Sequence, residues 1–421
     1  MQTIQSERVG FSPQRLARVD RLLERYVQSG LLSGILGLVY RRGEVAYANA
    51  VGMRERETNR PMTEDTIFRI YSMTKPITAV AALMLYEEGR FLLDDPLANY
   101  IPGFEDVRVY AGGMENLETP DRPIHVKDLF MHTAGLTYGW DQEHPVEERY
   151  RKTIGDTEQL NLETFVERIA SLPLLYHPGS RWIYSYATDV LGRLVELLSG
   201  QSLDCFFRQE IFAPLGMNDT AFHLPPESID RFAACYWPPG GKMGPGTPPS
   251  PRPDYDEPYD LANLGEPRFD LQDAPTGSRY TRPPNFLSGG GGLVSTAGDY
   301  LRFAQMLLNG GVLDGNRLLG RKTVEMMRVN HLPAGLMPIQ VGPTPDSGYG
   351  FGLGVSVLTD PTASSQPGSA GSFGWSGAAT TQFWIDPTEE MIGLLLAQFF
   401  PFDYYPIARE FRLAAYQALV D

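Results

Sequence analysis

The sequence predicts an α+β protein: an antiparallel sheet flanked by helices, formed from both chain termini, with an inserted mainly helical region. Three observations support this class. β-rich runs around a turn follow the first helix, a long middle region shows helical periodicity, and strand-like runs return near the end of the chain. No internal repeat interrupts this order.

The first elements are a helix, a hairpin and a second helix. Apolar residues recur at helical spacing between Ser12, which suits an N-cap, and Gly30, which suits a helix stop. Two β-rich runs then flank residues 41–43, a sequence typical of a hairpin turn. Apolar residues from Ile77 onward predict a helix of about five turns that ends near Gly89.

The later elements are helical first and strand-like afterwards. Residues 125–230 are expected to be mostly helical, because their periodic segments stop at Gly or Pro. Residues 237–284 hold about a dozen prolines, which fits either a disordered linker or an ordered loop around the body. A cap at Ser295 or Thr296, a helix, strand-like runs and a last helix over residues 406–420 follow.

These elements predict two domains. A discontinuous sheet domain takes residues 1–75 and 289–421. A mainly helical domain takes residues 76–288 and includes the Pro-rich loop 237–284. The chain of 421 residues is long enough for this division.

The composition excludes several classes of function. A net charge of −15 argues against nucleic acid, whose phosphates bind basic surfaces. No apolar stretch approaches the length that crosses a bilayer, and the N-terminal residues lack the apolar core of a secretory signal. We therefore expect no membrane association and a cytoplasmic location. Cys205 and Cys235 are expected to be reduced thiols. The six histidines show no paired metal spacing, so we expect neither a metal nor a cofactor.

The candidate chemistry starts at YSMTKP, residues 71–76. Of the five lysines, only Lys75 has a serine three residues upstream. Ser72 and Lys75 would share a helix face, where a lysine kept from water can act as a base toward the hydroxyl. Pro76 lacks an N–H and belongs in a first helical turn, which places Ser72 at the positive helix end. Alone, the motif also fits an N-cap serine beside a solvated lysine.

Two further segments extend this hypothesis. Tyr184 and Tyr186 precede a predicted helix, and a tyrosine beside a lysine amine can pass a proton between nucleophile and leaving group. Gly377 and Ala378 lie in a strand-like run, where small side chains permit close approach of a ligand. A strand N–H there would be an oxyanion donor opposite the Ser72 N–H. On their own the tyrosines also fit ordinary packing.

Together these motifs resemble the serine β-lactamase and penicillin-binding-protein superfamily, and within it the class C β-lactamase-like carboxylesterases of family VIII. Residues 72–75, Ser-Met-Thr-Lys, match the S-x-x-K motif of the family. Residues 184–186, Tyr-Ser-Tyr, match the Y-S-x form of the esterases, and residues 375–377, Trp-Ser-Gly, match their W-x-G form. The resemblance covers essentially the whole chain, is weakest over residues 237–284, and implies a β-lactamase/transpeptidase-like fold.

The resemblance also implies a role for each matched residue. Ser72 would be the acylated nucleophile, Lys75 its base and Tyr184 the proton relay, with the lysine and the tyrosine sharing protons between steps. The N–H groups of Ser72 and Ala378 would form the oxyanion hole. The residues expected to contact the substrate are Trp375, Gly377, Tyr138 and Tyr186.

Departures from the β-lactamase pattern favour an esterase. Trp375 stands where β-lactamases have a lysine that binds the substrate carboxylate, and Tyr186 stands where they have an asparagine. We therefore expect a serine carboxylesterase that hydrolyses short-to-medium acyl esters through a Ser72 acyl-enzyme, with weak β-lactam hydrolysis as a side reaction. The alternatives are an acyltransferase that uses the same acyl-enzyme, a β-lactamase, and a non-catalytic ligand-binding or scaffold protein.

Two other residues are set aside. Ser376 is the nearest match to a nucleophile elbow, but its surroundings lack the strand–elbow–helix order of an α/β-hydrolase. His132 is expected to be a structural turn residue, since the proposed machinery has no role for it.

Overall fold

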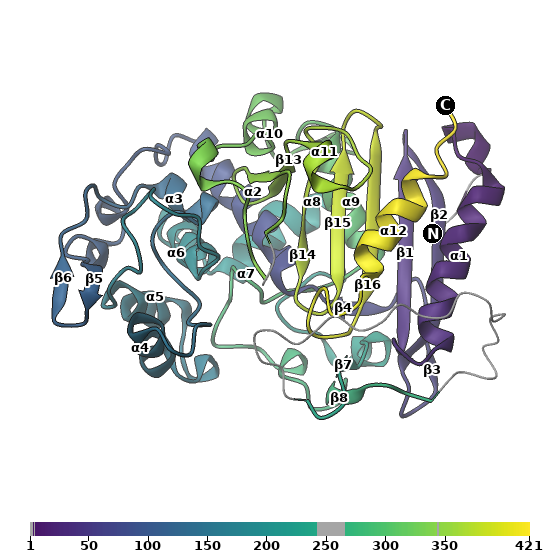
Figure 1. Ribbon diagram of the computed structural model, residues 1–421, viewed down its shortest axis with the longest axis horizontal. Helices are drawn as coiled ribbons and strands as arrows, with labels where there is room; N and C mark the ends of the chain where they lie inside the picture. Colours follow the sequence, from purple (N-terminus) through teal and green to yellow (C-terminus); the bar gives the residue numbers. More distant parts are fainter. Residues whose placement is uncertain (1–2, 4, 242–265, 343–344) are drawn as a thin grey trace.

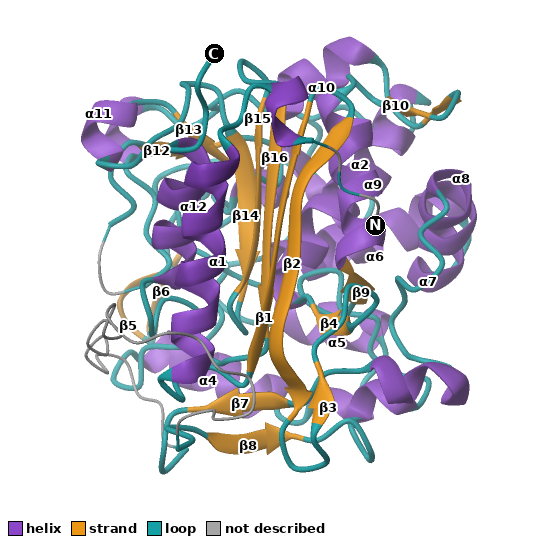
Figure 2. Ribbon diagram, turned by 90° about the vertical axis from the view of Figure 1, so that its right-hand side faces the viewer, coloured by secondary structure: helices purple, strands orange, loops and turns teal. Residues whose placement is uncertain are grey.

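An eight-stranded antiparallel sheet forms the centre of the molecule (Figures 1 and 2). The computed structural model describes residues 3, 5–241, 266–342 and 345–421. Listed in sheet order, the strands are β12 (Tyr349–Phe351), β13 (Ser356–Leu358), β14 (Phe373–Gly377), β15 (Thr381–Asp386), β16 (Met391–Ala397), β1 (Gly34–Arg41), β2 (Glu44–Glu55) and β3 (Arg60–Pro61). Segments from both ends of the chain thus share one sheet, and the predicted α+β class is confirmed.

The two halves of the sheet join where β1 pairs with β16 along seven residue pairs, from Ile35 opposite Ala397 to Arg41 opposite Met391. All eight residues of β1 are buried, because helices cover both faces of the sheet. The predicted hairpin after β1 is present. Arg42 and Gly43 adopt φ values of +50° and +91°, which suit a two-residue turn between twisted antiparallel strands.

Two helices from opposite ends of the chain, α1 (Pro13–Gln28) and α12 (Ile407–Tyr416), cover one face of the sheet (Figure 2). The apolar stripe of α1, which includes Leu16, Val19 and Leu23, is buried. Ser12 occupies the N-cap position as predicted, although its side chain makes no capping hydrogen bond.

Helices α2 (Thr74–Glu87) and α9 (Ala297–Leu308) lie on the other face. Helix α2 has 14 residues, about four turns instead of the five expected, because residues 71–73 form a 3-10 turn. It is buried nearly all round. The cap predicted for α9 is Thr296, whose side chain accepts a hydrogen bond from the Asp299 N–H.

The middle of the chain is mainly helical and extends beyond one edge of the sheet (Figure 1). Its helices are α3 (Val126–Met131), α4 (Pro145–Ile154), α5 (Leu162–Ala170), α6 (Ala187–Ser199), α7 (Leu203–Phe206) and α8 (Ala213–Leu215). A hairpin of β5 (Val109–Gly113) and β6 (Asn116–Glu118) lies at its outer end. The division into two domains at residues 75 and 289 stays a prediction.

Shorter elements complete the chain. They are the ribbons β4 (Ile67–Arg69) with β9 (Val294–Thr296), β7 (Cys235–Trp237) with β8 (Asp270–Asp273) and β10 (Val312–Leu313) with β11 (Asn316–Arg317), and the helices α10 (Arg321–Met327) and α11 (Pro361–Ser364). Residues 242–265, the middle of the Pro-rich loop, lie outside the described residues. The described ends of that loop are ordered, since β7 pairs with β8. Buried Arg69 donates to the Asp273 carboxylate at 2.6 Å.

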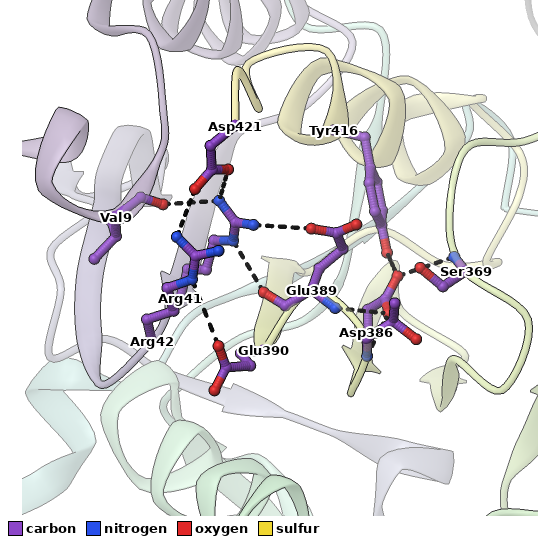
Figure 3. Close-up of polar contacts among 10 residues, drawn as sticks. Val9, Arg41, Arg42, Ser369, Asp386, Glu389, Glu390, Tyr416 and Asp421 are labelled. Atoms are coloured by element: carbon purple, nitrogen blue, oxygen red, sulfur yellow. Dashed lines mark hydrogen bonds and ion pairs between the residues drawn. The ribbon is translucent and has the colours of Figure 1, made fainter.

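Polar contacts join the β1–β2 turn to the last residue (Figure 3). Arg41 is 2% exposed and donates to the Val9 carbonyl (2.9 Å), the Glu389 carboxylate (2.8 Å) and the Asp421 carboxylate (2.5 Å). Arg42 also contacts Asp421, at 2.5 Å. These charge-assisted hydrogen bonds fix the end of the β1–β2 hairpin against the last residue of the chain.

The structure also bears on three predictions made for the whole chain, which concern the cysteines, membrane association and metal binding. Cys205 and Cys235 form no disulfide. Among the described residues, no helix combines the length and apolar character needed to span a membrane. In the same part of the chain, no group of three or more His, Cys, Asp or Glu side chains is placed to hold a metal ion.

Candidate active site

Ser72 lies in a 3-10 turn, Tyr71–Met73, that leads directly into α2. The first hydrogen bond of this turn runs from the Met73 N–H to the Ile70 carbonyl at 2.9 Å, so the Ser72 N–H precedes it and has no partner within the helix. Tyr71 has a φ of +41°, a costly conformation for a residue with a side chain. Such strain next to a proposed nucleophile is typical of functional sites.

The Lys75 side chain lies against the Ser72 hydroxyl. Lys75 Nζ donates to Ser72 Oγ at 3.1 Å and to the Gly290 carbonyl at 2.6 Å. The lysine is only 1% exposed. Within the described chain it forms no ion pair with a carboxylate. A buried amine in contact with a serine is inconsistent with the alternative interpretation, a solvated lysine beside a capping serine.

Tyr184 comes from the loop before α6, and the centre of its ring lies 4.6 Å from Lys75 Nζ. Its hydroxyl accepts a hydrogen bond from Trp375 Nε1 at 3.2 Å. His132 packs against the same ring, with 4.9 Å between ring centres, and its Nδ1 lies 3.3 Å from Ser185 Oγ. These contacts hold the phenol beside the amine, so three segments distant in sequence meet at Lys75.

Strand β14 passes the start of α2 at Gly377. A Cβ atom there would lie 2.3 Å from the Ile70 carbonyl oxygen, so this approach requires glycine. Ala378 follows directly, and its N–H makes no hydrogen bond to the described residues. The N–H groups of Ser72 and Ala378 therefore lie on adjoining segments, and neither has an acceptor among the described residues, so both are available to bind an oxyanion.

An aromatic cluster, formed by Tyr138, Trp140, Tyr184, Tyr186 and Trp375, lies beside the lysine. The Tyr138 ring centre is 5.5 Å from Lys75 Nζ, 5.2 Å from the Tyr184 ring and 4.4 Å from the Tyr186 ring. Trp140 stacks on Tyr138 at 5.1 Å and lies 5.7 Å from Tyr184. Trp140 is 50% exposed, so it forms the outer, solvent-facing end of the cluster.

Burial controls the charge of the groups around Lys75. It raises the pKa of Tyr138 well above its ordinary value, and burial together with the Asp189 charge raises the pKa of Tyr186 to about 12. Burial, reinforced by the Lys75 charge, holds the pKa of His132 well below its usual 6.5. These three groups are therefore neutral near pH 7 and add no charge beside the Lys75 side chain.

The structure brings together every site residue predicted from the sequence and adds three others. Trp140 lies two residues after the predicted Tyr138, and its exposure could not be inferred from that spacing. Asp189 is a carboxylate in the first turn of α6 that is only 1% exposed. In the sequence, Asp189 appears as an acidic residue among the apolar residues of a predicted amphipathic helix. Gly290, which binds Lys75, belongs to a run of four glycines, residues 289–292.

Ser376 and His132, which have no role in the proposed machinery, also have defined positions in the fold. Ser376 lies within strand β14, opposite Gln382, and not at a turn between a strand and a helix. His132 ends α3 in a left-handed conformation with φ +56° and is buried. It is a turn residue as expected, although its ring also touches Tyr184.

Comparison with known proteins agrees with this geometry. The family profile described as Beta-lactamase matches residues 19–417. Esterase EstB from Burkholderia gladioli is 35% identical over 385 residues, which cover 90% of this chain and 89% of EstB.

Solved structures of similar proteins also match this chain over nearly its whole length. EstCE1, described as a hydrolase with promiscuous acyltransferase activity, has a TM-score of 0.77 at 29% identity, with coverage of 96% of this chain and 99% of EstCE1. Simvastatin synthase LovD from Aspergillus terreus has a TM-score of 0.74 at 22% identity, with coverage of 96% and 98%, and supports the fold alone. The sheet built from both chain ends, the motifs and the nearly full-length match together establish that the chain belongs to the β-lactamase family and is a serine hydrolase of that fold.

Proposed function

We propose that this protein is a serine carboxylesterase that hydrolyses short-to-medium acyl esters through a Ser72 acyl-enzyme. The observation that carries the proposal is the contact between Lys75 Nζ and Ser72 Oγ in a site where the amine is 1% exposed. A buried amine at hydrogen-bond distance can take the proton that makes a serine hydroxyl nucleophilic. The likeness to esterase EstB over most of both chains supports an ester as the substrate.

In the proposed acylation step, Ser72 Oγ attacks the ester carbonyl carbon and its proton passes to the pair formed by Lys75 and Tyr184. The carbonyl oxygen becomes an oxyanion that accepts hydrogen bonds from the Ser72 and Ala378 N–H groups. The intermediate then collapses, the bond to the alcohol oxygen breaks, and the proton reaches that oxygen through the Tyr184 hydroxyl. The alcohol leaves, and the acyl group stays on Ser72.

Deacylation repeats these steps with water. A water molecule loses a proton to the Lys75–Tyr184 pair and attacks the acyl carbon, and Ser72 regains its proton as the acid leaves. An alcohol in place of water would receive the acyl group instead. Acyl transfer is therefore the second candidate function, favoured by the likeness to EstCE1, a hydrolase described as having promiscuous acyltransferase activity.

The Trp375 side chain favours an ester over a β-lactam. It is 7% exposed and its Nε1 donates to Tyr184, so this position offers apolar bulk and one hydrogen bond in place of a cation. A substrate carboxylate would find no charge partner on this side chain. Tyr186 likewise presents a ring where the β-lactamase pattern has an amide. We expect uncharged esters to react much faster than β-lactams, with weak β-lactam hydrolysis as a side reaction.

Mass spectrometry after reaction with diethyl p-nitrophenyl phosphate tests the proposal. We expect one diethylphosphoryl adduct, located on Ser72, and loss of p-nitrophenyl butyrate hydrolysis in the treated protein. Ser72→Ala should give neither adduct nor turnover, whereas Ser376→Ala, the matched serine control, should retain both. Full turnover by Ser72→Ala, an adduct elsewhere, or no adduct in the wild type would reject the proposal, the last in favour of a non-catalytic binding protein.

Two finer assignments are part of the same proposal. We place the protein in family VIII on its Y-S-x and W-x-G motifs, and we retain the cytoplasm as the predicted location. Cell fractionation with an antibody against the chain tests the location, and recovery outside the cytoplasmic fraction would contradict it.

A further inference from the structure

Asp189 and the glycine-rich segment, residues 288–293, have no part in the proton transfers described above. Asp189 Oδ1 accepts hydrogen bonds from Ser288 Oγ at 2.6 Å and from the Gly290 N–H at 3.0 Å. The side chain is 1% exposed, and no Lys or Arg of the described chain forms an ion pair with it. A buried carboxylate without an ionic partner is costly, so its presence beside the proposed active site needs a reason.

Gly290 connects this carboxylate to the lysine. Its N–H binds Asp189, and its carbonyl accepts the 2.6 Å hydrogen bond from Lys75 Nζ. Only glycine fits, because a Cβ atom would lie 2.6 Å from Asp189 Oδ2. The segment is also held on α2, where Thr78 Oγ1 donates to the Gly289 carbonyl at 2.7 Å. The lysine and the carboxylate are therefore joined through one rigid residue.

We propose that Asp189 is a positioning residue for Lys75, which it acts on through Gly290, and that its charge stabilises the ammonium form of the lysine. This inference rests on the proposed function. The hydrogen bonds orient the Gly290 carbonyl, which keeps Nζ within reach of Ser72 Oγ. The negative charge favours the state in which Lys75 holds the serine proton, between attack and departure of the leaving group.

The other titratable groups facing the pair contribute little competing charge near pH 7. Tyr138 and Tyr184 present their rings to Lys75, and His132 packs against the Tyr184 ring. Tyr186 faces Asp189. Burial raises the pKa values of Tyr138 and Tyr186 and lowers that of His132, so these groups are neutral. Burial raises the pKa of Asp189 above its ordinary value, and the Ser288 hydrogen bond, the Lys75 charge and the Gly290 hydrogen bond oppose that rise. The negative charge of Asp189 in turn reaches Tyr138 and Tyr186.

The pH dependence of a single chemical step tests the inference. The probe is diethyl p-nitrophenyl phosphate: a P–O bond forms to Ser72, the bond to p-nitrophenolate breaks, and the serine proton passes to Lys75. Asp189→Asn keeps an oxygen that can accept both hydrogen bonds but removes the charge. Loss of a neighbouring negative charge favours the neutral amine, so we expect the acid limb of the rate profile to move about one pH unit lower. Ser288→Ala, which removes one hydrogen bond and no charge, should leave the acid limb in place.

An unmoved acid limb in folded Asp189→Asn would overturn the inference, as would an equal shift in Ser288→Ala. If Asp189→Asn does not fold, adjacent glycines supply a second matched pair. A Cβ at Gly290 meets the carboxylate at 2.6 Å, whereas a Cβ at Gly291 has its nearest neighbour at 3.7 Å. We expect Gly290→Ala to react at least about tenfold more slowly than Gly291→Ala, and equal rates would also overturn the inference. Failure of the wild type to react at Ser72 would instead reject the proposed function.

Discussion

Trp140 provides the sharpest test of how the site selects its acyl group. One face of its indole stacks on Tyr138 with 16° between the ring planes, and half of the side chain is exposed. The indole also lies 5.7 Å from Tyr184, a proposed catalytic residue. An acyl chain that leaves the reacting carbon in this direction would therefore cover the open face of Trp140. Trp140→Ala removes that face and leaves the proton-transfer groups in place.

The size of the effect follows from the exposed area. A fully covered indole buries about 250 Å², so 50% exposure leaves about 125 Å² open. A chain that covers about half of this area would gain about 1.5 kcal/mol at about 25 cal/mol per Å². This free energy corresponds to about a tenfold change in kcat/KM. An acetyl group is too short to cover the same area, so its rate should change much less.

The assay is the ratio of kcat/KM for p-nitrophenyl octanoate to that for p-nitrophenyl acetate. We expect this ratio to fall about tenfold in Trp140→Ala, with the acetate rate within about twofold of the wild type. Leu92→Ala is the matched control, because Leu92 is 63% exposed and follows the opposite end of α2. An unchanged ratio in a variant with normal thermal unfolding would refute the placement of Trp140 against the acyl chain.

Four further predictions concern the proposed machinery and its surroundings. Lys75→Ala and Tyr184→Phe should each lower kcat for p-nitrophenyl butyrate by at least about 100-fold, and activity within about tenfold of the wild type would remove that residue from the machinery. Trp375→Phe loses the 3.2 Å hydrogen bond to Tyr184 but keeps an aromatic ring, so it should lower kcat by about tenfold at constant acyl preference. Trp375→Ala should shift the preference itself, and the reverse pattern would contradict this placement. The pKa of His132 is well below 6.5 in the folded protein because of burial. Below about pH 6.5 the unfolded chain binds a proton there that the folded chain does not, so the free energy of unfolding falls by up to about 1.4 kcal/mol per pH unit as the pH drops. Urea unfolding of His132→Asn should show a smaller slope than the wild type, and equal slopes would argue against the neutral, buried ring. EDTA should leave ester hydrolysis unchanged, and strong inhibition would require a metal that the predicted chemistry does not use.

The sequence by itself determined the features that depend on a few neighbouring residues. The Arg42-Gly43 turn, the buried stripe of α1 and the start of α2 near Pro76 follow from turn chemistry, helical spacing and the missing proline N–H. The same holds for the contact between Ser72 and Lys75, because residues three apart on a helix share a face. The resemblance of the motifs to those of the family predicted Tyr184 and Trp375 as further residues of the site.

Only the tertiary structure decided how distant segments meet. The hydrogen bond between Trp375 and Tyr184 joins residues 191 positions apart. The hydrogen bonds from Lys75 to the Gly290 carbonyl and from the Gly290 N–H to Asp189 join three separate segments of the chain. Such contacts depend on strand register and on the packing of helices across a sheet, which no local spacing encodes. For that reason the sequence could name the nucleophile and its neighbour, whereas the burial of the lysine and the position of its carboxylate partner required the folded chain.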